Sequence, residues 1–265
     1  MSGAETRIHE HLAETRGNGV AVLRVDREAA LGALSRGMVE ALGGYLTRLR
    51  SDEDVRVLVL TGTGRGFIAG ADLNEYSGVG RTAFDDYQKL SRSVFDQLAA
   101  LPQPTVAAVN GYALGGGFEV ALCCDLIVAS TAARFGLPEI SLGLLPGGGG
   151  TVRLTRAVGA RVAKELVLTG RRIKAPEARD LRLVTAVVEA DELLPRALEL
   201  AGTIARQAPL AAREAKRLVD DGLETGQAAA LTREQQVLSW LYTTADAQEG
   251  VAAFLEKREA VFHGR

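Results

Sequence analysis

The 265-residue sequence has few of the residue types on which many enzyme active sites depend. It contains three histidines, and all of them lie near the two ends, at His9, His11 and His263. A Ser-His-Asp triad needs a central histidine and a zinc site usually draws on His and Cys, so we expect neither a triad nor a metal centre. The only cysteines, Cys123 and Cys124, are adjacent, which implies no disulfide framework.

The sequence also lacks a strong charge imbalance, many aromatic residues and long apolar runs. Its formal net charge is -2 and aromatic residues make up 5% of it, so neither nucleic acid nor an anionic membrane is expected as a partner. The longest apolar runs fall short of the roughly 20 residues that cross a bilayer. Residues 1–16 are polar and carry both signs of charge, unlike a secretory signal, so we expect a cytoplasmic protein.

The most informative stretch runs from residue 105 to residue 151. Residues 105–109 form a continuous apolar run that predicts a buried strand, and residues 118–124 are apolar enough for a fully buried helix. Three glycines, 115–117, precede that helix. Glycines let a ligand approach the backbone, and the first N–H groups of a helix point outward at its positive end. The junction therefore favours a developing negative charge on oxygen.

Two glutamates stand out in this stretch because nothing around them is charged. Glu119 is the only charge between Thr105 and Cys124, and Glu139 is the only charge between Arg134 and Arg153. An ionised carboxylate in apolar surroundings loses hydration, so we expect raised pKa values and a role in proton transfer. The alternatives are a Glu119 paired with an arginine and a Glu139 that is a solvated loop residue.

Elsewhere the pattern alternates between strands and helices. Residues 62–67 are glycine-rich after a strand, but they lack GxGxxG spacing, so we expect a turn and no dinucleotide site. Strands are predicted over 20–25, 55–61, 105–109, 125–129, 134–136 and 184–188. Helices are predicted after a Ser35 cap and over 83–101, 118–124, 151–158, 161–169 and 175–180.

From residue 191 the pattern becomes helical, over 191–206, 209–221, 225–244 and 246–261. Strand-helix units followed by a helical tail predict an α/β core with a helical appendage, which we divide into 1–190 and 191–265. Periodicity does not separate a doubly wound sheet from other α/β architectures.

Four motifs resemble the crotonase superfamily, and most closely its enoyl-CoA hydratase members. They are Phe-Ile-Ala-Gly-Ala-Asp-Leu at 67–73, Gly-Gly-Gly-Phe-Glu at 115–119, Pro-Glu-Ile at 138–140, and Gly-Leu-Leu-Pro-Gly-Gly-Gly-Gly-Thr at 143–151. The resemblance is continuous from about residue 55 to residue 188. It implies a spiral of ββα turns, with a C-terminal helical region that mediates trimer contacts.

The resemblance also implies a reaction: syn hydration of a trans-2-enoyl-CoA, with no cofactor beyond the CoA thioester substrate. It assigns the oxyanion hole to the backbone N–H groups of Ala71 and Gly116. It assigns acid–base work to Glu119 and Glu139 together, with Glu139 exchanging the proton at the α carbon. Both glutamates are present here, which favours a hydratase over other reactions of the superfamily.

Other expected contacts with the acyl-CoA substrate follow from the same motifs. They are at Ala69, Asp72, Leu73, Asn74 and Gly148, with Lys257 reaching CoA from a neighbouring subunit of a homotrimer or hexamer. The alternatives are a helix cap for Asp72, a tight connector at Gly147 to Gly150, and a solvated helix face for the tail.

The sequence departs from the family pattern at several positions that affect CoA contacts more than proton transfer. They are Gly32, where family members often have Asn, Asn74 in place of a lysine, Val152 in place of a glutamine, and Arg182 in place of a glycine. Two alternatives to a hydratase remain: another acyl-CoA enzyme of this fold, such as an isomerase or a hydrolase/lyase, and a non-catalytic RNA-binding member.

Overall fold

A seven-stranded sheet forms the centre of the computed structural model, which describes residues 4–75 and 77–265. The strand order is β1-β2-β3-β4-β6-β8-β11. An antiparallel hairpin starts the sheet, and from β3 onward neighbouring strands are parallel. The strands are β1 Thr6–His9, β2 Leu12–Gly17, β3 Val20–Val25, β4 Val57–Gly62, β6 Thr105–Val109, β8 Leu126–Ser130 and β11 Ala186–Val188.

A second, four-stranded sheet lies at the end of these strands, in the order β10-β9-β7-β5. Its strands are short: β5 Gly66–Ile68, β7 Tyr112–Leu114, β9 Arg134–Gly136 and β10 Ile173–Lys174. Three of them follow a strand of the large sheet directly, and each such pair leads into a helix. This repeat is the predicted spiral of ββα turns, so the predicted fold class is confirmed.

The expected turn at residues 62–67 is present, but it is shorter than predicted. Gly62 ends β4, a single bridge joins Thr63 to Gly66, and β5 begins at Gly66. β1, β2, β5, β7 and β10 were not predicted, because strands of two to six residues with glycine or charge give no clear alternation.

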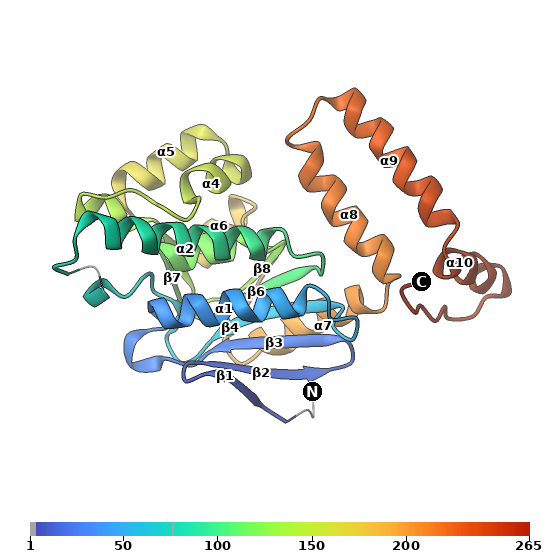
Figure 1. The fold of residues 1–265 in the computed structure, drawn as a ribbon, viewed down its shortest axis with the longest axis horizontal. Coiled ribbons are helices and arrows are strands. Elements are labelled where there is room, and N and C mark those ends of the chain that lie inside the picture. The colour runs from blue at the N-terminus through green and yellow to red at the C-terminus, as the bar shows by residue number, and fades with distance from the viewer. Residues whose placement is uncertain (1–3, 76) are drawn as a thin grey trace.

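Helices cover both faces of the large sheet (Figure 1). On one face lies the larger apolar core, which includes residues of α1 Arg36–Leu49, α2 Arg81–Ala99, α3 Gly116–Cys123, α4 Gly150–Val158, α5 Ala160–Thr169 and α6 Ala175–Asp180. Within it, α4 packs against α3, and α5 packs against α4. Ser35 caps α1 as predicted, its hydroxyl accepting a hydrogen bond from the Met38 N–H at 3.3 Å. The other face packs against α7 Leu193–Ala205.

The close approach of α7 follows from its sequence. Ala197, Ala201 and Ala205 recur every four residues on one face, and all are buried against the valines of β3, β4 and β6. Small side chains at that spacing let a helix lie flat on a sheet. The predicted division between residues 190 and 191 stays a prediction, and α7 belongs by its packing to the sheet.

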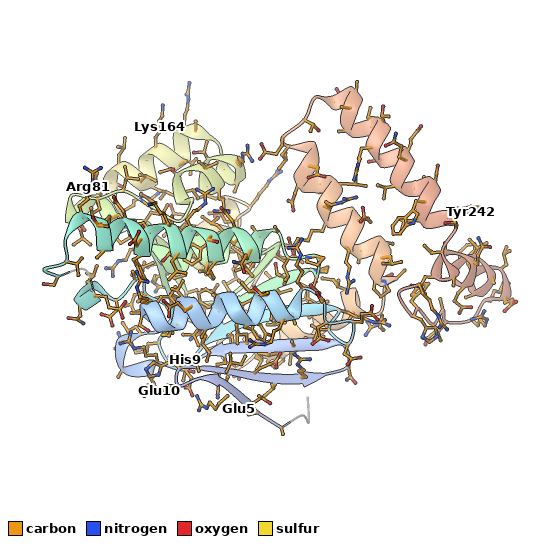
Figure 2. The ribbon with its side chains drawn as sticks, in the orientation of Figure 1. Glu5, His9, Glu10, Arg81, Lys164 and Tyr242 are labelled. Atoms are coloured by element: carbon orange, nitrogen blue, oxygen red, sulfur yellow. The ribbon has the colours of Figure 1, made fainter. Side chains whose placement is uncertain are left out.

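Three further helices extend beyond the sheet: α8 Pro209–Gly222, α9 Gln227–Tyr242 and α10 Ala245–Glu256. We call them the C-terminal arm. Figure 1 shows α8 and α9 side by side next to the core, with α10 at the outer end. The arm exposes many large apolar side chains, which are Val219, Leu223, Leu231, Leu238, Trp240, Tyr242, Val251, Phe254 and Leu255; Tyr242 is labelled at the outer end of α9 in Figure 2.

Polar contacts join the arm and the tail to the core. Lys216 of α8 pairs with Asp125 at 2.9 Å, and Asp125 also accepts hydrogen bonds from Thr105. Arg56 donates to the carbonyl of Ala205 and to that of Phe262 in the tail.

The last helix is shorter than the predicted 246–261 pattern. It ends at Glu256 because Lys257 takes a left-handed conformation with φ 56°. Within residues 4–75 and 77–265, no helix has the length and apolar character needed to cross a membrane.

Candidate active site

Glu119 lies on α3, the short helix that follows β6 and β7. Gly115 turns the chain into this helix with φ 51°, and a side chain at Gly117 would clash with the carbonyl of Ile68. Glycine at these positions lets the helix start directly against the backbone of the second sheet. Glu119 is consequently buried, with 3% of its surface exposed.

The Glu119 carboxylate is held by backbone amides of the four-glycine run 147–150. Its Oε1 accepts a hydrogen bond from the Gly150 N–H at 2.7 Å, and the Gly148 N–H also donates to it. Burial raises the pKa of Glu119, while these two amides and the more distant Arg153 act in the opposite direction. In the described part of the chain no arginine forms an ion pair with Glu119, so the alternative of an arginine partner is wrong.

Glu139 lies in the single turn of 3-10 helix η3 Pro138–Leu142 and has a different environment. The side chain is half-buried, and its Oε2 is buried without a hydrogen-bond partner in the described residues. Burial raises the pKa of Glu139 to about 7, with a further increase from the charge of Glu119. A solvated loop carboxylate would have neither property, so that alternative is excluded.

The start of α3 brings the two carboxyl groups to one place. A Cβ built on Gly115 would lie 3.1 Å from Glu139 Oε1, and one built on Gly148 would lie 2.7 Å from Glu119 Oε2. The ring of Phe95, from α2, lies between: it is 3.8 Å from the Cβ position of Gly116 and 2.5 Å from that of Gly148. Two acidic groups therefore lie beside an apolar wall made of glycine backbone and the ring of Phe95.

Two backbone N–H groups point toward this place. The N–H of Leu34 donates to the carbonyl of Gly70, and the carbonyl of Leu34 accepts from the N–H of Asp72. The N–H of Ala71, which lies between these two, therefore points away from Leu34. Gly116 is the first residue of α3 and has no acceptor within its helix. The Cβ position of Gly116 is 3.9 Å from the Ala71 nitrogen. The two amides are thus neighbours, beside the carboxyl groups.

The loop after Ala71 contains the other expected contact residues. Asp72 Oδ1 accepts from the backbone N–H of Asn74 at 3.1 Å, as a capping residue does for η2 Leu73–Glu75. Its Oδ2 accepts from Arg27 at 2.7 Å, and that hydrogen bond lowers the pKa of Asp72. The alternative of a helix cap is confirmed, and substrate contact by Asp72 stays a prediction.

The remaining predicted positions differ in how close they come to the glutamates. Ala69 is half-buried and its N–H donates to Leu31, while Leu73 and Asn74 are exposed. Lys257 is exposed and follows α10, which lies at the opposite end of the molecule from α4 and α5 (Figure 1). The structure does not bring Lys257 to the glutamates of its own chain.

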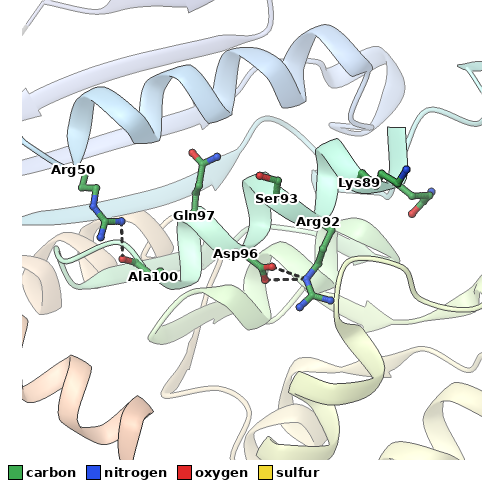
Figure 3. Close-up of a pocket in the computed structure, with 8 residues that line it drawn as sticks. Arg50, Lys89, Arg92, Ser93, Asp96, Gln97 and Ala100 are labelled. Atoms are coloured by element: carbon green, nitrogen blue, oxygen red, sulfur yellow. Dashed lines mark hydrogen bonds and ion pairs between the residues drawn. The ribbon is translucent and has the colours of Figure 1, made fainter. Parts of the chain in front are cut away.

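An open hollow of about 740 Å³ lies along the outer face of α2 (Figure 3). It is lined by Arg50, Gln88, Lys89, Arg92, Ser93, Asp96, Gln97 and Ala100. Neither Glu119 nor Glu139 is among these residues, so the hollow is not the candidate active site. It does expose one side of an ion pair between Arg92 and Asp96.

The structure adds residues that sequence reasoning missed. Phe95 lies in the helix predicted over 83–101, and no pattern indicated that its ring would lie next to Gly116 and Gly148. Arg153 and Asp96 were not considered, although Arg153 is the first charge after the four glycines. In residues 4–75 and 77–265 there is no cluster of three or more His, Cys, Asp or Glu suited to a metal ion.

Comparisons with known proteins identify the family to which the chain belongs. The family model for enoyl-CoA hydratase/isomerase matches residues 15–265. The chain is 43% identical to the 2,3-dehydroadipyl-CoA hydratase of Escherichia coli over 95% of its own length and 98% of that protein. It is 39% identical to the short-chain-enoyl-CoA hydratase of Clostridium acetobutylicum, over 91% and 92%. The crystal structure of the enoyl-CoA hydratase of Bacillus anthracis superposes with a TM-score of 0.94 at 38% identity, over 97% of this chain and 100% of that one.

Proposed function

Because this chain belongs to the enoyl-CoA hydratase/isomerase family, we propose that it hydrates a trans-2-enoyl-CoA reversibly to the 3-hydroxyacyl-CoA. The observation that carries this proposal is the pairing of two desolvated glutamates with two neighbouring backbone N–H groups, that of Ala71 and that of Gly116 at the start of α3. Proton transfer next to a thioester carbonyl needs both elements.

The amides of Ala71 and Gly116 form the oxyanion hole in this proposal. As water adds to the β carbon, negative charge develops on the thioester oxygen as an enolate. Two fixed N–H donors aimed at that oxygen would each stabilise the transition state by about 3–4 kcal/mol. Neither donor needs to reorganise, because the Leu34 ladder fixes Ala71 and the helix start fixes Gly116.

The two glutamates divide the proton transfers. Glu119, whose ionised form is supported by two N–H donors, takes a proton from water as the oxygen bonds to the β carbon. Glu139, whose pKa is raised to about 7, delivers its proton to the α carbon as the enolate collapses. The proton taken up by Glu119 then passes to Glu139 before the next turnover, so the net change is one water added on one face of the double bond. General acid–base assistance of this kind contributes roughly 10²- to 10⁴-fold to a rate.

Further substrate contacts are part of the proposal. We place the acyl-CoA along Ala69, Asp72, Leu73 and Asn74 and near Gly148, with no cofactor besides the CoA thioester. Lys257 would reach the CoA bound to a second copy of the chain, in a homotrimer or a hexamer. The apolar surface of the C-terminal arm supports assembly, because such surface is seldom left exposed. A cytoplasmic location stays a prediction.

The test is an assay of the purified protein with crotonyl-CoA. Hydration removes the conjugated double bond, so the absorbance of the enoyl thioester should fall when the protein is added. A 3-enoyl-CoA should show no gain of conjugation, which separates a hydratase from an isomerase. No loss of absorbance with crotonyl-CoA or with longer trans-2-enoyl thioesters would overturn the proposal.

An acyl-chain series would then define the substrate. The named relatives differ in their acyl groups, one a dicarboxylic 2,3-dehydroadipyl group and the other short-chain. The series should therefore contain both kinds. The Gly32 and Asn74 departures lie in the segments expected to contact CoA and bear on the outcome.

A further inference from the structure

The four glycines 147–150 hold Glu119 but have no side chains of their own. Gly149 adopts φ 106°, a conformation that glycine reaches easily and other residues rarely do. A run of this kind is highly flexible in isolation. Its shape must therefore be fixed by hydrogen bonds from elsewhere to its backbone.

One side chain fixes the run from the face opposite Glu119. Arg153, on the first turn of α4, donates from Nη1 to the carbonyl of Gly148 at 2.7 Å. Its guanidinium lies against Gly149, where a Cβ would collide with Nη1. Gly148 thus donates its N–H to Glu119 on one side and accepts from Arg153 on the other.

Arg153 is itself held by α2. Its Nη2 donates to Asp96 Oδ1 at 2.7 Å, and Asp96 also accepts from Arg92 Nε at 2.9 and 2.8 Å (Figure 3). The Arg153 side chain is 19% exposed, which is less than half the exposed fraction of Asp96 or of Arg92. A forked guanidinium presents a separate nitrogen to each acceptor in a fixed geometry, whereas an ammonium would have to reach both acceptors from a single nitrogen.

We propose that Arg153, oriented by Asp96, is a positioning residue that holds the glycine run and thereby sets the geometry of Glu119. This inference rests on the proposed role of Glu119. It requires no contact between Arg153 and the substrate, because the effect passes through the Gly148 peptide.

Electrostatics give a second consequence of the same contacts. The charged and titratable groups near Glu119 are Arg153 from α4, Arg92 and Asp96 from α2, Glu139 from η3, and Cys123 from α3 itself. Arg153 and Arg92 both oppose the increase in the pKa of Glu119 that burial causes. Removing the Arg153 charge should therefore shift the acid limb of the pH–rate profile to higher pH.

The experiment compares Arg153→Gln, Arg153→Lys and Asp96→Asn with the control Arg156→Gln, in crotonyl-CoA hydration from pH 5.5 to 9. Arg156 lies on the same helix and pairs with Glu224 in the arm instead. Displacement of a catalytic group by about 1 Å costs up to roughly 10²-fold, so Arg153→Gln should lower kcat roughly 10- to 100-fold with KM nearly unchanged. The acid limb of the pH–rate profile of Arg153→Gln should move to higher pH.

The other variants separate geometry from charge. Arg153→Lys should keep the acid limb in place and recover only part of kcat. Asp96→Asn should lower kcat by several-fold, since it weakens the charge-assisted contact without emptying the site. In a Glu119→Gln background, Arg153→Gln should cost little more, because both changes disable the same group.

Each result decides the matter. If Arg153→Gln matches Arg156→Gln in kcat and acid limb while Glu119→Gln is inactive, the positioning role is wrong and the proposed function stands. If Glu119→Gln is fully active, the proposed role of Glu119 fails, and the positioning role of Arg153 fails with it, while the hydratase activity itself stands. Should Arg153→Gln not fold, an Asp96→Asn protein with unaltered kcat and pH profile overturns the proposal, as do fully multiplicative losses in the double variant.

Discussion

The two glutamates flank the same helix start but are held in opposite ways. Glu119 is on a regular helix, is 3% exposed, and receives N–H donors from Gly150 and Gly148. Glu139 is in a single 3-10 turn, is half-buried, and has an oxygen without a partner among the described residues. Burial raises the pKa of both, but two N–H donors of the glycine run support the charged form of Glu119, whereas Glu139 is supported by its own backbone N–H. Burial alone does not decide which carboxyl is the acid, and the N–H donors do.

The largest effect on activity is expected from a substitution of Glu119. Glu119→Gln keeps the shape of the side chain but removes the base, so hydration of crotonyl-CoA should fall by roughly 10³-fold. The exposed Glu165→Gln, on α5, serves as the control and should be unaffected. Turnover of Glu119→Gln equal to that of the control would remove Glu119 from the mechanism.

Glu139→Gln should have a smaller effect on hydration, of roughly 10²-fold, and a distinct signature. Exchange of the α hydrogens of butyryl-CoA with D₂O, followed by NMR, should be lost, because Glu139 is assigned to that carbon. If exchange survives in Glu139→Gln and disappears in Glu119→Gln, the two roles are reversed.

Gly148→Ala tests how tightly the Glu119 side of the site is built. The new methyl group would lie 2.5 Å from Phe95 Cδ2 and 2.7 Å from Glu119 Oε2, so the ring or the carboxylate must move. The rate of hydration should fall by a factor of several tens, because catalysis is sensitive to such shifts. Gly222→Ala, where nothing lies within 4 Å, is the matched control. Equal activities would show that the carboxylate tolerates displacement.

The pH dependence of the hydration rate distinguishes the two glutamates, because Glu119 acts in its ionised form and Glu139 in its protonated form. Hydration requires protonated Glu139, so the rate should fall about tenfold per unit above a pH near 7, where its pKa lies. In Glu139→Gln the residual rate should lack this alkaline limb. An alkaline limb that persists unchanged in the variant would assign it to another group.

The smallest expected effect concerns stability. A carboxyl whose pKa is raised on folding from 4.5 to about 7 binds a proton more tightly in the native state. Unfolding is therefore increasingly favoured as the pH rises from 4.5 to 7, and the penalty is constant above that window. Glu139→Gln should raise Tm by a few degrees at pH 8 and leave it unchanged at pH 4.5. An equal increase in Tm at both pH values would mean that the destabilisation does not come from the charge of Glu139.

The sequence predicted Glu119 and Glu139 for a physical reason that survives in the structure. Each is an isolated charge in an apolar run. The run around Glu119 is buried, whereas Ile140 and Leu142 beside Glu139 are exposed and Glu139 itself is half-buried. The contacts that hold the Glu119 side chain in place could not be predicted in the same way. Arg153 and Asp96 are separated by 57 positions, and their contact exists because α2 and α4 both pack against α3. The strand at 134–136 was predicted, but the hairpin β1–β2 and the other strands of the second sheet, β5, β7 and β10, were missed because short strands with glycine or charge show no clear alternation.

The single tryptophan has a practical consequence for anyone following this protein by fluorescence. Trp240 is on α9 and 48% exposed, whereas the sheet and its covering helices contain no tryptophan. Emission will therefore report on the C-terminal arm and on its burial when copies associate. A change in intensity on dilution would follow dissociation, and a denaturation curve read from Trp240 would describe the arm while the spiral could still be intact.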